Sequence, residues 1–196
     1  MFTSSACHLE VQNVTYGPIQ NLSFAWPAGV SWVCGDEGKG KTTLLRLLAG
    51  HVQPTAGQVV TPEGGVFWVD LQSPEHDATP VQTCWDTLRM RYPHWNDAVL
   101  NDLAEALNMD EHREKQLHML SAGSRRKAMV IAALASGATI TLLDQPFAAL
   151  DFGSIRTLKA FLHEAAEHPS RAWIVADYTA PDDVPLASVL NLDEAR

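Results

Sequence analysis

A glycine-rich loop that follows a short apolar run and precedes a leucine-rich run constrains this sequence more than any other feature. The run at 30–34 has the composition of a buried strand, and leucines recur at helical spacing from residue 42 up to Gly50. The loop matches the pattern G-x-x-x-x-G-K-[S/T] at every fixed position, through Gly35, Asp36, Glu37, Gly38, Lys39, Gly40, Lys41 and Thr42. A strand, a glycine loop and a helix in this order predict a site that binds the phosphates of a nucleotide.

The residue types in the loop suit a bound triphosphate. Its three glycines let the backbone curl so that N–H groups face the β- and γ-phosphates. Lys41 supplies a fixed positive charge, the hydroxyl of Thr42 is a ligand for Mg²⁺, and the positive end of a helix at 41–49 faces the anion. We therefore expect ATP and Mg²⁺ to bind at residues 35–43, which include Thr43. A glycine turn with chance lysines is the alternative, and the strand–loop–helix context argues against it.

The rest of the chain alternates between strand and helix patterns. We expect strands at 8–14, 22–26, 30–34, 58–60, 66–69, 140–143 and 173–176, the last of these being the final clear strand. We expect helices at 41–49, 121–135 and 155–166, and a helical, polar stretch at 79–120. This order predicts an α/β fold, with a P-loop core around a parallel sheet and an N-terminal antiparallel β subdomain that begins within 1–34. We expect a helical subdomain at 79–127 to be inserted into this core. Residues 1–196 are expected to form one domain.

Composition and charge exclude several classes of protein. The chain has 14 Lys+Arg and 23 Asp+Glu, a net charge of −9, which argues against a nucleic-acid or anionic-membrane binder. Its three cysteines, Cys7, Cys34 and Cys84, form no C-x-x-C pair, which indicates a reducing compartment without a disulfide framework or zinc site. The longest nearly apolar run, 128–143, is too short to span a bilayer, and the first ten residues lack a signal-peptide pattern. We expect a cytoplasmic, soluble domain.

Two further stretches have the order and spacing of one P-loop family. In LLDQPFAALD, Asp144 ends an apolar run and Asp151 closes the stretch. In LSAGSRRK, Ser121 precedes Asp144 by 23 residues. Together with the glycine loop, these stretches resemble the Walker B, D-loop and LSGGQ signature motifs of the ABC-type ATPases, and the resemblance covers the whole chain. The forms LSAG and LDQPF on so short a chain are similar to those of compact exporters, such as the haem-exporter ATPase of cytochrome c maturation.

The resemblance implies that residues of the signature address a nucleotide held by a partner subunit. These residues are Ser121, Ala122 and Gly123, which open a predicted helix whose N–H groups could face a phosphate. Taken alone, Ser121 is explained equally well as the N-cap of that helix. The family's head-to-tail dimer would place ATP between the glycine loop of one subunit and the signature of the other, close to Asp151.

The resemblance also implies roles for two residues outside the main motifs. Tyr16 lies 25 residues before Lys41, where the family places an aromatic ring against adenine, although a tyrosine also suits the end of a strand. Gln72 corresponds to the Q-loop glutamine, with Asp70 as the neighbouring alternative in register. The Mg²⁺ ligands that the family implies, some of them through water, are Thr42, Gln72 and Asp144.

Two positions depart from the family pattern. Gln145 stands where a general-base glutamate follows the Walker B aspartate, and an amide can orient a water but cannot take its proton. Asp177 or Tyr178 stands where a switch histidine would follow the strand at 173–176, and a carboxylate there repels the γ-phosphate. Glutamine for glutamate is also the usual isosteric change for trapping an ATP-bound state, but the missing histidine favours natural degeneracy. Hydrolysis is therefore expected to be severely slowed.

The sequence thus predicts the ATP-binding subunit of an ABC transporter. The resemblance implies a homodimer, or a pseudo-symmetric dimer with another ABC ATPase, on a separate transmembrane subunit at the cytoplasmic face of the membrane. The helical subdomain and the loop at Gln72 would carry the coupling. Two alternatives remain: a module whose ATP binding switches a regulatory assembly without hydrolysis, and a P-loop kinase of small molecules, which would leave LSAGS without explanation.

Overall fold

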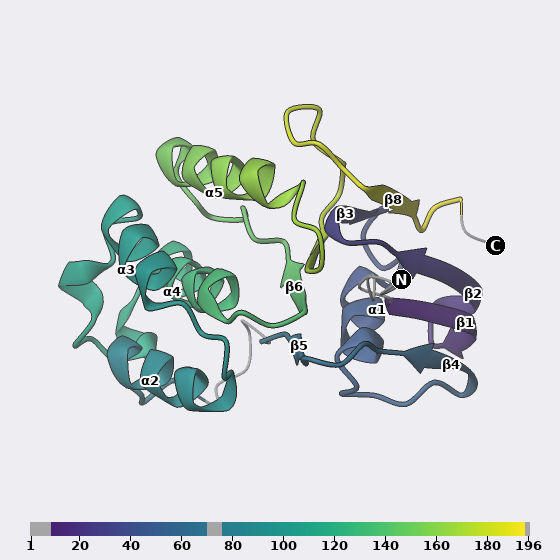
Figure 1. Cartoon of the computed structure of the whole chain (residues 1–196), viewed down its shortest axis with the longest axis horizontal. Helices are drawn as coiled ribbons and strands as arrows, with labels where there is room; N and C mark the ends of the chain where they lie inside the picture. Colours follow the sequence, from purple (N-terminus) through teal and green to yellow (C-terminus); the bar gives the residue numbers. More distant parts are fainter. Residues whose placement is uncertain (1–8, 70–75, 195–196) are drawn as a thin grey trace, which may run out of the picture. The chain divides into compact units, whose positions relative to one another are not determined.

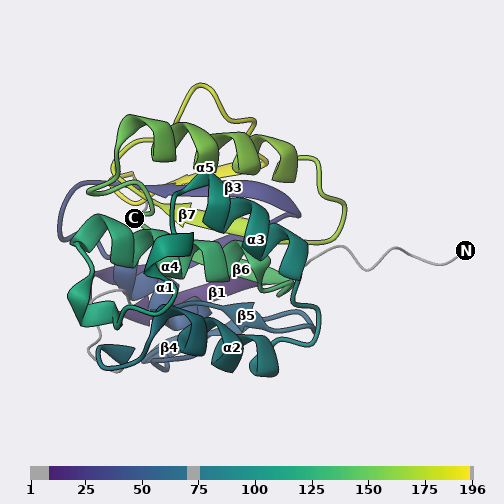
Figure 2. The ribbon, with the colours of Figure 1, turned by 90° about the vertical axis from the view of Figure 1, so that its left-hand side faces the viewer.

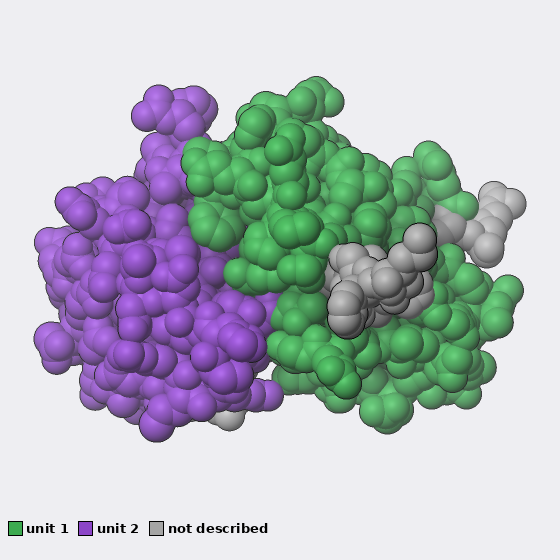
Figure 3. Space-filling view, viewed as in Figure 1, with its two compact units in different colours: residues 1–68, 139–145, 159–196 green, residues 69–138, 146–158 purple. Residues whose placement is uncertain are grey.

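The computed structural model describes residues 9–69 and 76–194 (Figure 1), and the sequence predictions for Cys7, Asp70 and Gln72 lie outside them. The chain divides into two compact units, shown in different colours in Figure 3. Unit 1 comprises residues 1–68, 139–145 and 159–196, and unit 2 comprises 69–138 and 146–158. Each unit is therefore assembled from segments that are distant in the sequence.

A parallel sheet of five strands forms the centre of unit 1. Its strand order is β5-β6-β7-β3-β8, and all of the neighbouring pairs are parallel. The strands are β3 (Gly29–Cys34), β5 (Val66–Phe67), β6 (Ile140–Asp144), β7 (Ala172–Ala176) and β8 (Ser188–Asn191). β7 is wholly apolar and buried, and β6 is buried up to Asp144 at its end, as expected of strands covered on both faces. β3, which leads into the glycine loop, lies between two strands from the last part of the chain.

Unit 1 also contains a smaller antiparallel sheet with the order β2-β1-β4. Its strands are β1 (Leu9–Tyr16), β2 (Ile19–Trp26) and β4 (Ala56–Val60). Helix α1 (Lys41–Leu48) buries four leucines in the same hydrophobic cluster as residues of both sheets, among them Trp26 and Ile174. One apolar core therefore holds the helix that follows the glycine loop against both sheets.

Unit 2 is helical (Figures 1 and 2). It contains α2 (Val81–Arg91), α3 (Asp97–Ala106), α4 (Ala122–Ala135) and the start of α5 (Phe152–Ala165), with short 3-10 turns at Asp110–His112 and Leu117–Met119. The indole of Trp85 on α2 is buried and donates to the Ala128 carbonyl of α4 at 2.8 Å. Asn96 caps α3 by accepting hydrogen bonds from two N–H groups of its first turn. Among the described residues, no helix is long and apolar enough to cross a membrane.

The expected fold class is confirmed, and several boundaries are corrected. Gly50 follows α1 with a φ of 72°, as expected of a glycine that ends a helix. The stretch at 173–176 is not the final strand, because β8 follows it. α5 begins at Phe152 rather than at residue 155, because the Asp151 carboxylate accepts from the Ser154 N–H and caps the helix three residues earlier. β4 begins at Ala56, two residues before the strand expected at 58–60, and β5 ends at Phe67 rather than at residue 69.

Candidate functional site

The glycine loop joins the end of β3 at Cys34 to the start of α1 at Lys41. Gly38 and Gly40 have φ values of 78° and 100°, in the left-handed region that side chains disfavour. A Cβ at Gly40 would also lie 2.8 Å from the Pro18 ring and 2.9 Å from Ile19. The predicted strand–loop–helix order is therefore present, and Gly40 is required by both its conformation and its close neighbours.

The ammonium of Lys41 is held within the loop. Its side chain is 7% exposed, and Nζ donates hydrogen bonds to the carbonyl oxygens of Gly35 and Asp36. The same Nζ lies 4.6 Å from the centre of the Tyr178 ring, which is 51% exposed. A positive charge is thus concentrated at the N-terminus of α1, where the helix dipole adds to it. An anion of the size of a phosphate group bound at this point would lie close to both the ammonium and the positive end of the helix.

The two described residues expected to bind Mg²⁺ lie in contact with each other. The Thr42 hydroxyl donates to Oδ2 of Asp144 at 2.6 Å. Thr42 lies in the first turn of α1, and Asp144 ends β6. A carboxylate and a hydroxyl are oxygen donors of the kind that Mg²⁺ prefers, usually alongside water and phosphate oxygens. The donor set therefore fits the predicted ion, and the third residue of that prediction, Gln72, lies outside the described residues.

Gln145 and Asp177 follow β6 and β7 at the same edge of the parallel sheet. Gln145 has a φ of 45° and donates its backbone N–H to the Ala176 carbonyl at 2.8 Å. Asp177 donates its N–H to the Val33 carbonyl at 3.1 Å, and its carboxylate accepts the Tyr178 N–H at 2.8 Å. Ligands of open α/β sheets bind at the carboxyl ends of the strands, and β3, β6 and β7 all end here. The structure therefore brings both positions that depart from the family pattern to the edge of the sheet that carries the glycine loop.

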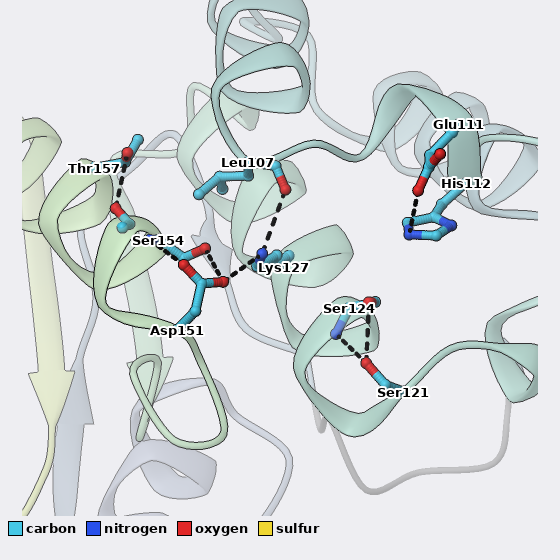
Figure 4. A network of polar contacts seen from close by, with 10 residues as sticks. Leu107, Glu111, His112, Ser121, Ser124, Lys127, Asp151, Ser154 and Thr157 are labelled. Carbon is cyan, nitrogen blue, oxygen red and sulfur yellow. Dashed lines mark hydrogen bonds and ion pairs between the residues drawn. The ribbon is translucent and has the colours of Figure 1, made fainter.

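The signature residues lie in unit 2, at the start of α4 (Figure 4). Ser121 is the N-cap, and its hydroxyl oxygen accepts the Ser124 N–H at 3.1 Å. Ala122 and Gly123 form the first turn, and a Cβ on Gly123 would lie 2.5 Å from the Ala149 carbonyl oxygen. Gly123 is therefore needed for a close backbone contact. The interpretation of Ser121 as an N-cap is confirmed, and its role toward a partner's nucleotide stays a prediction.

Asp151 is bound on two sides by residues of unit 2 (Figure 4). Its carboxylate accepts from the N–H and the hydroxyl of Ser154, at 2.8 and 2.7 Å, and lies 2.9 Å from Nζ of Lys127. These Ser154 hydrogen bonds and the Lys127 ammonium hold the pKa of the carboxyl well below its usual range. Lys127 also donates to the Leu107 carbonyl at 3.4 Å. Asp151 thus has a structural role as the cap of α5.

Tyr16 ends β1 and is half-buried against the core of unit 1, so its interpretation as a strand-end residue is confirmed. Sequence reasoning named Tyr178 only as the alternative to Asp177 at the switch position, and it missed the contact of this ring with the Lys41 ammonium. It also missed Asp193, which accepts the Asp36 N–H and pairs with Lys39 of the loop. No local pattern could have placed Asp193, because its partners lie more than 150 residues earlier.

The known proteins to which the chain is similar agree with the family resemblance of its motifs. The family model described as "ABC transporter" matches residues 19–148. A cytochrome c biogenesis ATP-binding export protein CcmA from Pseudomonas savastanoi pv. phaseolicola is 34% identical over 142 residues, which are 66% of each chain. The CcmA protein of Pseudomonas syringae pv. tomato is 31% identical over 172 residues, 82% of this chain and 81% of the relative.

Solved structures show the same fold. A putative ABC transporter ATP-binding protein from Pyrococcus furiosus superposes with a TM-score of 0.74 at 22% identity, covering 95% of this chain and 98% of the other. A putative metal-chelate type ABC transporter in an inward-facing conformation gives a TM-score of 0.70 at 24% identity, covering 89% of this chain and 74% of the other.

Proposed function

The chain belongs to the ABC transporter family of ATP-binding proteins, and on that premise we propose that it binds ATP and Mg²⁺ at the glycine loop. The observation that carries this proposal is the contact between Thr42 and Asp144, at 2.6 Å, beside the Lys41 ammonium. Two oxygens of the kind that Mg²⁺ prefers and one cation therefore lie close to the start of α1. The remaining loop residues, from Gly35 to Thr43, supply N–H groups to the phosphates, and Tyr16 is the candidate contact for adenine.

Each side chain has a distinct task in this proposal. Lys41 turns from the carbonyls of Gly35 and Asp36 toward the β- and γ-phosphates, and Thr42 and Asp144 hold Mg²⁺, with Gln72 as a further ligand. The ion, when bound, neutralises charge that develops on the phosphate oxygens. Calorimetry tests the site: Lys41→Ala should abolish ATP binding, whereas Lys159→Ala, a change of another lysine in unit 1, should leave it intact. Equal affinities of the two variants would contradict the proposal.

We further propose that hydrolysis is slow. The Gln145 amide can orient a water molecule, but it has no carboxylate that could accept the proton of that water. The Asp177 carboxylate is engaged by the N–H of its own neighbour Tyr178, and its charge would repel the γ-phosphate. Loss of a general base typically costs about 10²–10⁴-fold in rate. Some turnover remains, because positioning and electrostatics dominate phosphoryl transfer.

The decisive experiment compares phosphate release by the wild-type protein and by Gln145→Glu. We expect slow release from the wild type and a clear increase in the variant, limited by Asp177. A Lys41→Ala/Gln145→Glu double variant is the control, since it should release no phosphate. Turnover by the wild type equal to that of Gln145→Glu would contradict the proposal and would assign the base to another group.

ATP binding is proposed to close a dimer, either of two copies or with another ABC ATPase. In this dimer, residues 121–123 of one subunit face the triphosphate on the other, near Asp151, and the two sites are related by two-fold symmetry. Because hydrolysis is slow, the closed dimer should be long-lived. Size-exclusion chromatography with Mg²⁺ and ATP should show a dimer that reverts to a monomer when the nucleotide is removed.

The membrane-spanning part of the transporter is proposed to be a separate chain. In this view residues 1–196 form one nucleotide-binding domain on the cytoplasmic face, and the helical subdomain at 79–127 docks on the membrane chain. The export proteins to which the chain is similar support a role in export. Co-purification with a membrane protein would support this assignment. A protein that binds ATP, releases no phosphate and stays away from membranes would favour the non-hydrolysing regulatory module, which Gln145 and Asp177 also suit.

A further inference from the structure

A carboxylate from the last part of the chain contacts the glycine loop. The Asp36 N–H donates to Asp193, with distances of 3.1 Å to Oδ2 and 3.3 Å to Oδ1. The ammonium of Lys39 lies 3.2 Å from Oδ1, and the side chains of Lys39 and Asp193 are 46% and 33% exposed. One side chain therefore holds two residues of the loop, one through its backbone and one through its charge.

The position of Asp193 is itself fixed by a hydrogen-bonded turn after β8. Asn191 accepts the Asp193 N–H at 3.0 Å and donates to the Glu194 carboxylate at 2.9 Å. The N–H of the buried Leu192 donates to the Cys34 carbonyl at 2.8 Å. Because β8 pairs with β3, this turn lies directly beside the start of the loop. The contact is therefore built by the fold and is not a chance pair of exposed side chains.

The peptide groups on either side of Asp36 are held from two directions. Asp193 accepts the Asp36 N–H, while Lys41 donates to the Asp36 carbonyl oxygen. When Lys41 turns toward a phosphate, it gives up that carbonyl, which keeps only a 3.4 Å hydrogen bond from the Lys39 N–H, while Asp193 still holds the Asp36 N–H. A loop that keeps its shape through this change loses less conformational freedom when the ligand binds.

We propose that Asp193 is a positioning residue that keeps the glycine loop in its binding shape and thereby raises its affinity for nucleotide. The proposal rests on the proposed ATP site. The carboxylate also carries a charge that repels phosphates, but Lys39 neutralises it, and salt screens the remainder. The gain from a pre-shaped loop therefore exceeds the repulsion. The contact should be worth about three- to tenfold in affinity for Mg²⁺ and ATP.

The test uses the full chain with Asp193→Ala and Asp193→Asn. Asparagine keeps an oxygen that accepts the Asp36 N–H but removes the charge, whereas alanine removes both. Asp182→Ala is the matched control, because it removes one negative charge from an exposed position of the same unit. Two measurements are made: the Kd for Mg²⁺ and ATP by calorimetry, and amide hydrogen exchange of residues 35–39 in the nucleotide-free protein.

We expect Asp193→Ala to weaken ATP binding by about three- to tenfold and to accelerate exchange at Asp36, with Asp193→Asn and Asp182→Ala close to the wild type. Unchanged affinity and exchange in Asp193→Ala would overturn the proposal. Equally tighter binding by both Asp193 variants would also overturn it, since the carboxylate would then act only as a competing anion. If the wild-type protein binds no ATP, the proposed function fails instead, and the exchange of Asp36 alone decides whether Asp193 holds the loop.

Discussion

The Thr42 hydroxyl lies 2.6 Å from Oδ2 of Asp144, although the two residues are 102 positions apart. Thr42 is placed by the first turn of α1 and Asp144 by the end of β6, so two separate elements must pack correctly to make this contact. The hydrogen bond holds the hydroxyl and the carboxylate close enough to share one small ion. The pair therefore reports both on the fold of unit 1 and on its proposed metal chemistry.

The first prediction follows from this pair. Asp144→Asn and Thr42→Ala should each reduce the gain in ATP affinity that Mg²⁺ provides, because each removes one oxygen ligand or its charge. The measurement is the ATP Kd by calorimetry, with Mg²⁺ and with EDTA. Asp182→Asn, which removes an exposed charge elsewhere in unit 1, is the control. A double variant of Thr42 and Asp144 that keeps the full effect of Mg²⁺ would contradict this assignment.

The second prediction concerns Tyr178 and Lys41. The Tyr178 ring lies 4.6 Å from the Lys41 ammonium, and such cation–π contacts at exposed sites contribute about 0.5–1 kcal/mol. Because Lys41 must turn from the ring to reach a phosphate, Tyr178→Ala should tighten ATP binding by about two- to fivefold, the equivalent of that energy. Tyr178→Phe keeps the ring and should bind like the wild type. Weaker binding by Tyr178→Ala would show instead that the ring contacts the nucleotide.

The third prediction tests the close contact at the start of α4. A Cβ on Gly123 would lie 2.5 Å from the Ala149 carbonyl oxygen, so Gly123→Ala must shift backbone atoms. Overpacking of this kind costs about 1–3 kcal/mol in the free energy of unfolding. Gly153→Ala is the matched control in the first turn of α5, where the added Cβ would meet only the Asp151 carboxylate at 3.3 Å. Urea unfolding that gives equal stabilities for both variants would contradict the contact.

The fourth prediction concerns the Cys84 thiol. Burial raises its pKa to about 11, although the charge of Arg125 acts in the opposite direction. In a Cys7→Ser background at pH 8, a thiol reagent should label the half-buried Cys34 and leave Cys84 unmodified until urea is added. Labelling of Cys84 at the rate of the unfolded chain would contradict the prediction.

The same shift predicts how stability depends on pH. The thiol of the unfolded chain ionises around its ordinary pKa of 9.0, whereas the folded thiol stays neutral up to about 11. The unfolded state therefore loses its proton first, and the free energy of unfolding should decrease as the pH rises from 9 toward 11. Cys84→Ala should remove this part of the pH dependence. A profile in that range that is the same in both proteins would show that the thiol does not contribute.

Local patterns were enough to predict much of the fold and the position of the glycine loop. The loop at 35–42 and the end of α1 at Gly50 depend on glycines and leucines close together in the sequence, so their structure could be predicted. Asp151 followed three residues later by Ser154 is also a local signal for a helix start. β8 has only two apolar residues in four, and its pairing with β3 defines it as a strand.

The rest of the site depends on contacts that no local pattern contains. Asp177 and Tyr178 are adjacent in the sequence, and only the structure shows that the carboxylate accepts its neighbour's N–H while the ring lies over Lys41. Asp193 reaches the loop because a parallel strand carries it there. Such contacts are decided by the packing of distant strands, and sequence periodicity does not determine them.

The position of β3 in its sheet has a consequence for synthesis on the ribosome. Val33 pairs with Ala176 on one side and with Leu190 on the other, so both neighbours of β3 are translated last. At about 5–20 residues per second, the nascent chain carries β3 with both edges unpaired for roughly 7–30 s. Exposed strand edges attract other strands, and this interval is when the chain is most open to misassembly. The glycine loop proposed to bind phosphate is translated early, but the strand that leads into it can pair on both sides only when translation is nearly complete.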